Sequence, residues 1–195
     1  MHHSDNSVDM RPLIVGITGP AGSGKSTAAA ALVADGYQRL PLALPIKHML
    51  RAGLGLTEEE TDGQLKQVVL SRLGLNVTPR TLMQTLGTEW GRDIDEHFWL
   101  KAWQARADKM IPHTGQGRAM IVVDDVRFMN EALFLRSLGA RIICIKGRPT
   151  VLSGSEQAHW SEIEWARIGA QDWVRSVEGR GTVRDFQDRV RRAAY

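Results

Sequence analysis

Residues 13–27 read Leu-Ile-Val-Gly-Ile-Thr-Gly-Pro-Ala-Gly-Ser-Gly-Lys-Ser-Thr. The apolar run that opens this stretch, residues 13–18, is typical of a buried strand in a parallel sheet. Residues 19–26 match the pattern G-x-x-x-x-G-K-[ST], and residues 26–34 are strong helix formers closed by Asp35-Gly36. The stretch therefore predicts a strand, a glycine-rich phosphate loop and a helix, in that order.

Each residue type in this loop has a physical reason to bind phosphate. Glycines let the backbone come close enough for its N–H groups to face phosphate oxygens. The helix that follows adds the positive end of its dipole. The ammonium of Lys25 reaches the β and γ phosphates, and the hydroxyl of Ser26 ligates Mg²⁺. We therefore expect a nucleoside triphosphate, since an incidental glycine-rich turn would lack the flanking strand and helix.

The rest of the chain alternates strands with helices. Strands are expected at 120–123, 141–145 and 173–177, helices at 43–52, 80–86, 95–110, 128–138 and 182–193, and a polar, partly helical segment at 57–73. This alternation predicts an α/β three-layer sandwich, with a mostly parallel central sheet of about five strands flanked by helices. No linker is evident, so we expect a single domain over 1–195 with a helical insertion at 43–111.

Composition excludes several classes of protein. With 43% apolar and 24% charged residues over 195 positions, the chain is an ordinary globular mixture and neither disordered nor collagen-like. Cys144 is its only cysteine, which excludes a disulfide scaffold and fits a reducing compartment. No apolar run approaches the ~20 residues that span a bilayer, and the first residues lack the features of a signal peptide. The sequence favours a cytoplasmic location without a membrane partner.

The positive charge is concentrated at the end of the chain. Lys and Arg total 25 against 22 acids, a net charge of +3, and residues 175–195 hold six Arg against three acids, which accounts for the whole excess. Only Phe186 and Tyr195 are aromatic there, whereas nucleic-acid binders usually interleave basic and aromatic residues. A solvated helix face is the favoured interpretation, and a nucleic-acid partner is not expected.

A second group of candidate residues follows the strand at 120–123. Asp124 stands where a carboxylate can hold Mg²⁺ together with Ser26. Asp125 and Arg127 can reach the same edge of the sheet and, with Lys25, are the expected catalytic residues. The alternative is that Asp125 and Arg127 only cap the next helix, and Glu131 either orients Arg127 or forms an ordinary surface pair.

A phosphate loop alone does not define an activity. The D-x-x-G and N-K-x-D patterns of GTPases are absent, and the chain is short for a motor. Among the phosphate-loop proteins, the remaining interpretation is a small kinase. Trp90, Trp99 and Trp103 are compatible with a core or with a slot for a nucleobase.

Five stretches make the chain similar to the bacteriophage deoxynucleoside monophosphate kinases, relatives of the adenylate-kinase-type enzymes. They are the phosphate loop 19–27; Leu44-Pro45-Ile46-Lys47; residues 80–88 with Phe98-Trp99; Asp125-Val126-Arg127 with Glu131; and His159-Trp160-Ser161-Glu162. They follow the order of that family over about residues 13–165. The segment R-x-L-M-Q-x-L-G-T at 80–88 is the most distinctive of them.

The resemblance implies a P-loop kinase that uses ATP and Mg²⁺ to phosphorylate a deoxynucleoside monophosphate. It implies that ATP is bound by Ala21, Gly22, Ser23, Gly24, Lys25, Ser26 and Thr27. It implies that the acceptor is bound by Ile46, Lys47, Lys66, Arg80, Gly87, Thr88, Trp99, Asp125, Arg127 and Glu131, with a loose match around Lys66. The chain is compact between Leu56 and Thr78, where some members carry insertions that help to select the base. No base preference follows.

Some alternatives remain open at this point. His159 either closes over the phosphates in a lid at 148–170, together with Arg148 or Arg167, or caps a helix that Glu162 starts. The acceptor is alternatively dephospho-coenzyme A, a nucleoside or DNA. A hydroxyl acceptor needs a general base such as Asp125, whereas the cations Lys47, Arg80 and Arg127 favour a phosphate acceptor. A homodimer is left open.

Overall fold

The computed structural model describes residues 12–110, 118–146 and 161–195, and for 161–163 only the backbone. Two compact units make up this structure. One, called here the sheet unit, comprises the chain up to Pro41 and from Ala107 onward. The other, the helical unit, is Leu42–Arg106.

The sheet unit is built on five parallel strands in the order β2-β3-β1-β4-β5. Their bounds are β1 Leu13–Thr18, β2 Gln38–Arg39, β3 Met120–Val123, β4 Arg141–Lys146 and β5 Val174–Glu178. The expectation of a mostly parallel sheet of about five strands is confirmed. The sequence analysis missed β2, because two residues are too short to show a periodic pattern.

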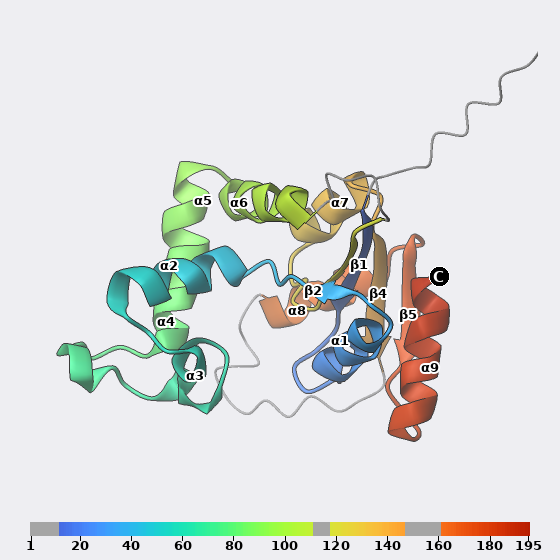
Figure 1. Cartoon of the computed structure of the whole chain (residues 1–195), viewed down its shortest axis with the longest axis horizontal. Coiled ribbons are helices and arrows are strands. Elements are labelled where there is room, and N and C mark those ends of the chain that lie inside the picture. Colours follow the sequence, from blue (N-terminus) through green and yellow to red (C-terminus); the bar gives the residue numbers. More distant parts are fainter. Residues whose placement is uncertain (1–11, 111–117, 147–160) are drawn as a thin grey trace, which may run out of the picture. The chain divides into compact units, whose positions relative to one another are not determined.

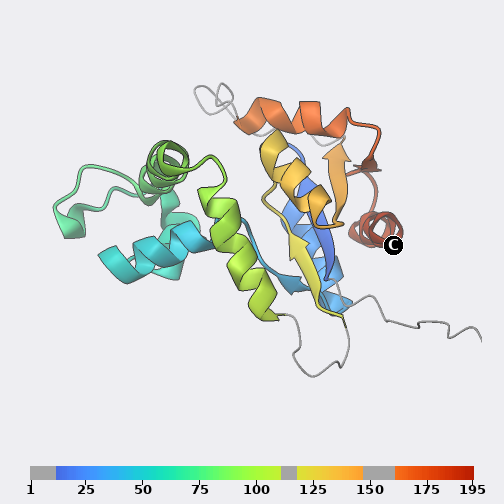
Figure 2. The same cartoon turned by 90° about the horizontal axis from the view of Figure 1, so that it is seen from above.

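Helices cover both faces of this sheet. They are α1 (Lys25–Ala34), α7 (Met129–Ser137), α8 (Ser161–Gly169) and α9 (Val183–Ala194), beside a short 3₁₀ turn η4 (Asp108–Met110). Because successive side chains in a strand point to opposite faces, Val15, Ile143 and Val177 belong to the core formed with α1 and α9 (Figure 1). On the other face α7 and α8 are neighbours (Figure 2), and Gly16 leaves room there for the side chain of Leu135. The predicted three-layer sandwich is confirmed.

The helical unit consists of short helices around its own apolar core. In chain order they are α2 (Leu44–Leu54), α3 (Glu58–Thr61), the 3₁₀ turns η1 (Gln64–Gln67) and η2 (Ser71–Leu73), α4 (Pro79–Gln84), the π-helical turn η3 (Thr85–Trp90), α5 (Gly91–Ile94) and α6 (Phe98–Ala107). Ile46 and Leu50, one turn apart on α2, are buried with Leu56 and Leu70. The unit is thus organised around one face of α2.

The helix expected at 80–86 is longer in the structure. Helical backbone runs from α4 through η3 into α5 and ends at Ile94, and α6 begins at Phe98 rather than at residue 95. Gly87 and Gly91 lie inside this helical stretch, at positions where neighbouring side chains occupy the space that a side chain of their own would need. A Cβ on Gly87 would lie 2.9 Å from Ile46 Cδ1, and one on Gly91 would lie 2.0 Å from Trp99 Nε1.

Within the described residues, no helix combines the length and the apolar character needed to cross a lipid bilayer.

Candidate active site

The glycine-rich loop between β1 and α1 has the backbone conformation that its sequence requires. Gly19, Gly22 and Gly24 all have positive φ, at 142°, 72° and 100°. A side chain on Gly19 would place its Cβ 2.7 Å from the carbonyl oxygen of Ile145 on β4. Only glycine combines such φ values with this close approach at low cost. The loop is thereby held compactly at the end of β1.

Lys25, the first residue of α1, folds back over this loop. Its Nζ donates hydrogen bonds of 2.7 Å to the carbonyl oxygens of both Gly19 and Pro20. The first turn of α1 holds no acidic residue, and Gly24 at its N-cap offers no side chain to the free N–H groups. A partly buried ammonium and the positive end of a helix dipole therefore lie at the same place, which is an arrangement that attracts phosphate.

Ser26 and Asp124 are the predicted magnesium ligands, and both belong to the sheet unit. Ser26 is exposed in the first turn of α1, and Asp124 directly follows β3. Because β1 and β3 are paired in parallel, their carboxyl ends meet at one edge of the sheet. A hydroxyl and a carboxylate are the hard oxygen donors that Mg²⁺ prefers, and phosphate oxygens and waters usually complete its coordination. The donor set fits the ion. In the parts of the chain described here, no group of three or more His, Cys, Asp or Glu residues forms a metal site on its own.

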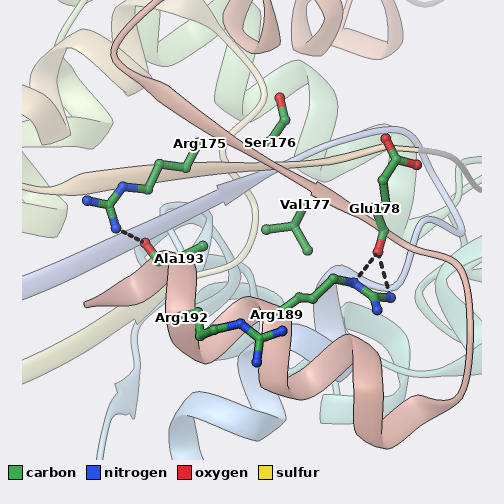
Figure 3. A pocket seen from close by; sticks show the side chains of 7 residues that line it. All are labelled: Arg175, Ser176, Val177, Glu178, Arg189, Arg192 and Ala193. Atoms are coloured by element: carbon green, nitrogen blue, oxygen red, sulfur yellow. Dashed lines mark hydrogen bonds between the residues drawn. The ribbon is translucent and has the colours of Figure 1, made fainter.

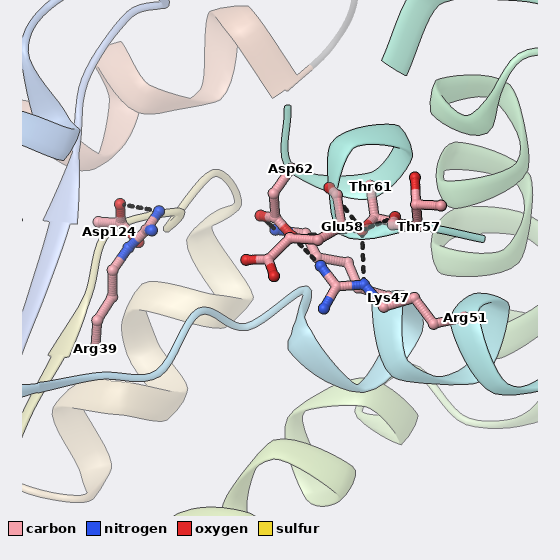
Figure 4. Close-up of polar contacts among 8 residues, drawn as sticks. All are labelled: Arg39, Lys47, Arg51, Thr57, Glu58, Thr61, Asp62 and Asp124. Carbon is pink, nitrogen blue, oxygen red and sulfur yellow. Dashed lines mark hydrogen bonds and ion pairs between the residues drawn. The ribbon is translucent and has the colours of Figure 1, made fainter. Parts of the chain in front are cut away.

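Asp124 is also bound by a residue that the sequence analysis missed. Arg39, at the end of β2, donates from Nε to Oδ1 at 3.0 Å and from Nη2 to Oδ2 at 2.7 Å (Figure 4). Asp124 is 3% exposed and Arg39 is 49% exposed, so the guanidinium covers a buried carboxylate. A lone arginine in a two-residue strand carries no motif. The sheet order alone places it beside β3.

Asp125, Arg127 and Glu131 lie at the same edge of the sheet, between β3 and α7. Asp125 is half-buried and Arg127 is exposed. The carboxylate of Glu131 accepts hydrogen bonds from the backbone N–H groups of Arg127 and Phe128, at 2.8 and 3.0 Å. Glu131 thus fixes the main-chain turn from which the Arg127 side chain projects. The sheet unit therefore brings the phosphate loop, Asp124, Asp125 and Arg127 to one edge.

In the helical unit, cations gather around Asp62. Lys47 Nζ and Arg51 Nη2 each lie 2.5 Å from a carboxylate oxygen of Asp62 (Figure 4). Burial would raise the pKa of Asp62, but the hydrogen bond and charge of Lys47, followed by the charges of Arg51 and Lys66, keep it below its usual value. Lys47 and Lys66, both expected to bind the acceptor, are therefore members of one cationic cluster. Arg51 is a further member that the sequence analysis did not identify.

Three other residues expected at the acceptor share an apolar cluster in this unit. Ile46 meets Gly87 across the close approach between α2 and η3, and Trp99 packs against the same core. Trp99 Nε1 donates to the carbonyl oxygen of Leu86 at 3.3 Å. Gly87 and Thr88 lie in the π-helical turn, a feature that is frequent at functional sites. Trp90, 43% exposed, packs edge-on against Phe98.

The remaining candidates are placed as follows. Arg80 is the second residue of α4 and is half-buried. His159, Arg148 and most of the expected lid lie outside the described residues, as does the side chain of Glu162. Helix α8 begins at Ser161, and Arg167 within it forms an ion pair with Glu164 at 2.5 Å.

Comparison with known proteins now gives the family. The family model described as deoxynucleotide monophosphate kinase matches residues 56–163, more than half of the chain. The chain belongs to this family. A protein of Acanthamoeba polyphaga mimivirus named "Putative deoxynucleotide monophosphate kinase" is 30% identical over 193 residues, covering 91% of this chain and 94% of that protein. Family membership makes the chain a nucleotide kinase, as the resemblance implied.

A solved kinase structure is similar in fold to this family member. A dephospho-CoA kinase from Campylobacter jejuni has a TM-score of 0.51 at 14% identity, covering 93% of this chain and 94% of that one. A gluconokinase from Sinorhizobium meliloti 1021 has a TM-score of 0.45 at 14% identity, with 95% and 92% covered. The first likeness, at this low identity, concerns the fold alone. It agrees with the five-stranded parallel sheet of a P-loop kinase.

Proposed function

We propose that this kinase transfers the γ-phosphoryl group of ATP to the phosphate of a deoxynucleoside 5′-monophosphate, giving ADP and the deoxynucleoside diphosphate. The observation that carries the proposal is the position of Lys25. Its ammonium is anchored over the glycine loop by two carbonyl oxygens, at the same edge of the sheet as Asp124, Asp125 and Arg127. Family membership supports a nucleotide as the substrate.

ATP would be held by residues 21–27. The backbone N–H groups of the loop and of the start of α1 face the phosphates, and Lys25 neutralises charge on the β and γ groups. Mg²⁺, when bound, would supply positive charge between these phosphates. Ser26 and Asp124 would hold the ion. Because Arg39 already donates to both carboxylate oxygens of Asp124, the ion would share this carboxylate with a guanidinium.

A phosphate acceptor needs cations rather than a base. Its oxygen is already ionised, so it attacks the γ-phosphorus directly while the bond from that phosphorus to the β,γ-bridging oxygen breaks. Several negative charges then come together and must be screened. Lys47, Lys66 and Arg80 of the helical unit are proposed to hold the acceptor phosphate, and Arg127 to screen the group in transfer. Ile46, Gly87, Thr88 and Trp99 are proposed to contact the nucleoside, and Asp125 and Glu131 to complete the acceptor site.

A lid over the phosphates is a further part of this proposal. We propose that residues 148–170 close over the phosphates, and Arg167 is the described cation of that segment. Its ion pair with Glu164 would have to open for it to reach a phosphate.

A coupled assay of ADP release tests the proposed reaction. The enzyme is mixed with ATP and Mg²⁺ and offered each common deoxynucleoside and ribonucleoside monophosphate, dephospho-coenzyme A, free nucleosides and single-stranded DNA. We expect turnover with at least one deoxynucleoside monophosphate and none with the acceptors that offer only a hydroxyl group. Turnover of dephospho-coenzyme A, of a nucleoside or of DNA alone would overturn the proposal.

A further inference from the structure

The basic C-terminal segment, residues 175–195, has no role in the proposed reaction. In the structure, four of its six arginines are of two kinds. Arg191 forms ion pairs with Asp35 and Asp188, at 2.8 and 3.1 Å. Arg175, Arg189 and Arg192 instead line a cavity of about 380 Å³ between the edge strand β5 and helix α9 (Figure 3). The other lining residues are Ser176, Val177, Glu178 and Ala193.

The partners of these three guanidiniums are mostly neutral. Arg175 Nη1 donates to the carbonyl oxygen of Ala193 at 2.9 Å, and Arg189 donates to the carbonyl oxygen of Glu178 at 3.0 and 3.2 Å. Arg189 also donates to the carbonyl oxygen of Arg180. The guanidinium of Arg192 has no hydrogen bond or ion pair with any residue that the structure describes. Carbonyl oxygens orient a guanidinium but leave its charge uncompensated.

Acidic groups near the cavity offset little of this charge. The carboxylate of Glu178 points away from the three guanidiniums in Figure 3. Asp185 lies one turn before Arg189 on α9. Its carboxylate accepts a hydrogen bond of 2.7 Å from the hydroxyl of Thr182, the N-cap residue of this helix. The hydrogen bonds from Thr182, and to a smaller extent the charge of Arg189, hold the pKa of Asp185 below its usual value, so this carboxylate compensates one arginine in part. A net positive charge remains on the cavity.

The shape and lining of the cavity decide which anion suits it. Its volume falls in the range of small-ligand pockets, roughly 300–1,000 Å³, rather than that of an extended groove. Val177 and Ala193 are its only apolar lining residues, and no aromatic ring is available to stack on a base. Arginine presents planar, paired N–H donors that fit two oxygens of one phosphate. Recognition here would thus rest on phosphates and not on a nucleobase.

We propose that the cavity between β5 and α9 is a second anion site, which binds the phosphate chain of a polyphosphorylated small molecule such as a nucleoside triphosphate. Three cations match a chain of phosphates better than a single phosphate. Because the base is not read, inorganic tripolyphosphate should bind as well as ATP does. The site is separate from the phosphate loop and does not depend on the proposed acceptor.

Calorimetric titration of the full chain with tripolyphosphate tests this site. To weaken binding at the phosphate loop, the titration is made in Lys25→Ala, where we expect the cavity site to remain. In Lys25→Ala/Arg192→Gln the affinity should fall on the order of tenfold, the effect of losing charged hydrogen bonds. Arg192 makes no contact that the fold needs, so a loss of folding is not expected. Adding Arg175→Gln to these two substitutions should lower the affinity for tripolyphosphate further.

The matched control removes equal charge outside the cavity. Arg184 lies on the same helix and does not line the cavity, so Lys25→Ala/Arg184→Gln should bind tripolyphosphate like Lys25→Ala. Equal losses in both variants, or no site left in Lys25→Ala, would overturn the proposal. So would a single-stranded oligonucleotide that binds more tightly than tripolyphosphate and displaces it. Turnover of a monophosphate by Arg192→Gln should be unchanged, which separates this test from that of the proposed reaction.

Discussion

Arg39 binds both carboxylate oxygens of Asp124, although the two residues are 85 positions apart in the chain. One end of this ion pair is buried and the other is half in solvent. A buried carboxylate that loses its charged partner is costly, whereas an exposed guanidinium that loses its partner is not. The pair therefore stabilises the sheet unit mainly because it prevents the Asp124 carboxylate from being buried without a partner charge.

The Arg39–Asp124 pair is tested by a double-mutant cycle. We expect Arg39→Ala to lower the free energy of unfolding by about 1–2 kcal/mol, because it leaves the Asp124 carboxylate buried without its guanidinium. In an Asp124→Asn background the same change should cost much less. Urea unfolding of the four proteins measures both values. Equal costs in the two backgrounds would show that Arg39 acts independently of Asp124.

Lys25→Ala should nearly abolish turnover while the fold is kept. Its ammonium acts where charge develops in transfer, and losing one such donor typically costs about 10²–10³ in kcat. Its two hydrogen bonds go to backbone carbonyls of a loop that its glycines already shape, so the melting temperature should change little. Steady-state kinetics and thermal unfolding are the measurements. Lys101→Ala, which removes an exposed lysine paired with Asp95, is the control and should be fully active. Normal turnover in folded Lys25→Ala would refute the assignment of the phosphate loop.

Lys47→Ala and Arg80→Ala should each raise the KM for the monophosphate and leave ATP binding unchanged. This is expected if both side chains hold the acceptor phosphate equally in the ground and transition states. Paired titrations of ATP and of the best monophosphate measure the two effects. Equal losses for both ligands would mean that these residues support structure, as the ion pair of Lys47 with Asp62 would allow.

Arg127→Lys should lower kcat substantially with little change in melting temperature. The substitution keeps the charge and the backbone N–H that Glu131 binds, but it removes the planar pair of donors that grips two phosphate oxygens. Since Arg127 is exposed, it adds little to the core. ATP affinity should be nearly unaltered, because Lys25 and the loop hold that nucleotide. A large loss of stability with normal kcat per folded molecule would place Arg127 in a structural role.

Glu60 should make the stability of the helical unit depend on acidity. Arg72 donates to both of its carboxylate oxygens, at 2.9 and 2.7 Å, and together with the backbone N–H of Thr57 it lowers the pKa of Glu60 to about 2. A carboxyl group whose pKa is lowered on folding stabilises the protein above its ordinary pKa. That contribution is lost as the pH falls through the folded value.

The measurement is the free energy of unfolding of wild type and Glu60→Gln across acidic pH. The difference in free energy of unfolding between the two proteins should be largest above the ordinary pKa of 4.5. It should disappear as the pH falls toward 2. Glu58→Gln, which removes a carboxylate from the same helix, is the matched control. A difference for Glu60→Gln that stays constant with pH would contradict the role of this ion pair.

Local sequence determined the elements on which the site is built. The strand, glycine loop and helix of residues 13–34 follow from an apolar run, positive-φ glycines and helix-forming residues, all within reach of one another along the chain. The same holds for Thr78 and Pro79, where the hydroxyl of Thr78 accepts from the N–H of Thr81 at the start of α4. Such features depend on hydrogen bonds between residues a few positions apart, so a short stretch of sequence is enough to predict them.

Tertiary structure decided what no short stretch contains. Gly87 and Gly91 lie within a helix, at positions where Ile46 and Trp99 occupy the space that their side chains would need. Arg39 reaches Asp124 because β2 pairs with β3, an arrangement set by sheet order. The physical reason is the distance along the chain over which each interaction acts. Backbone conformation depends largely on residues a few positions apart, whereas close approach and ion pairing depend on which distant elements become neighbours when the core is buried.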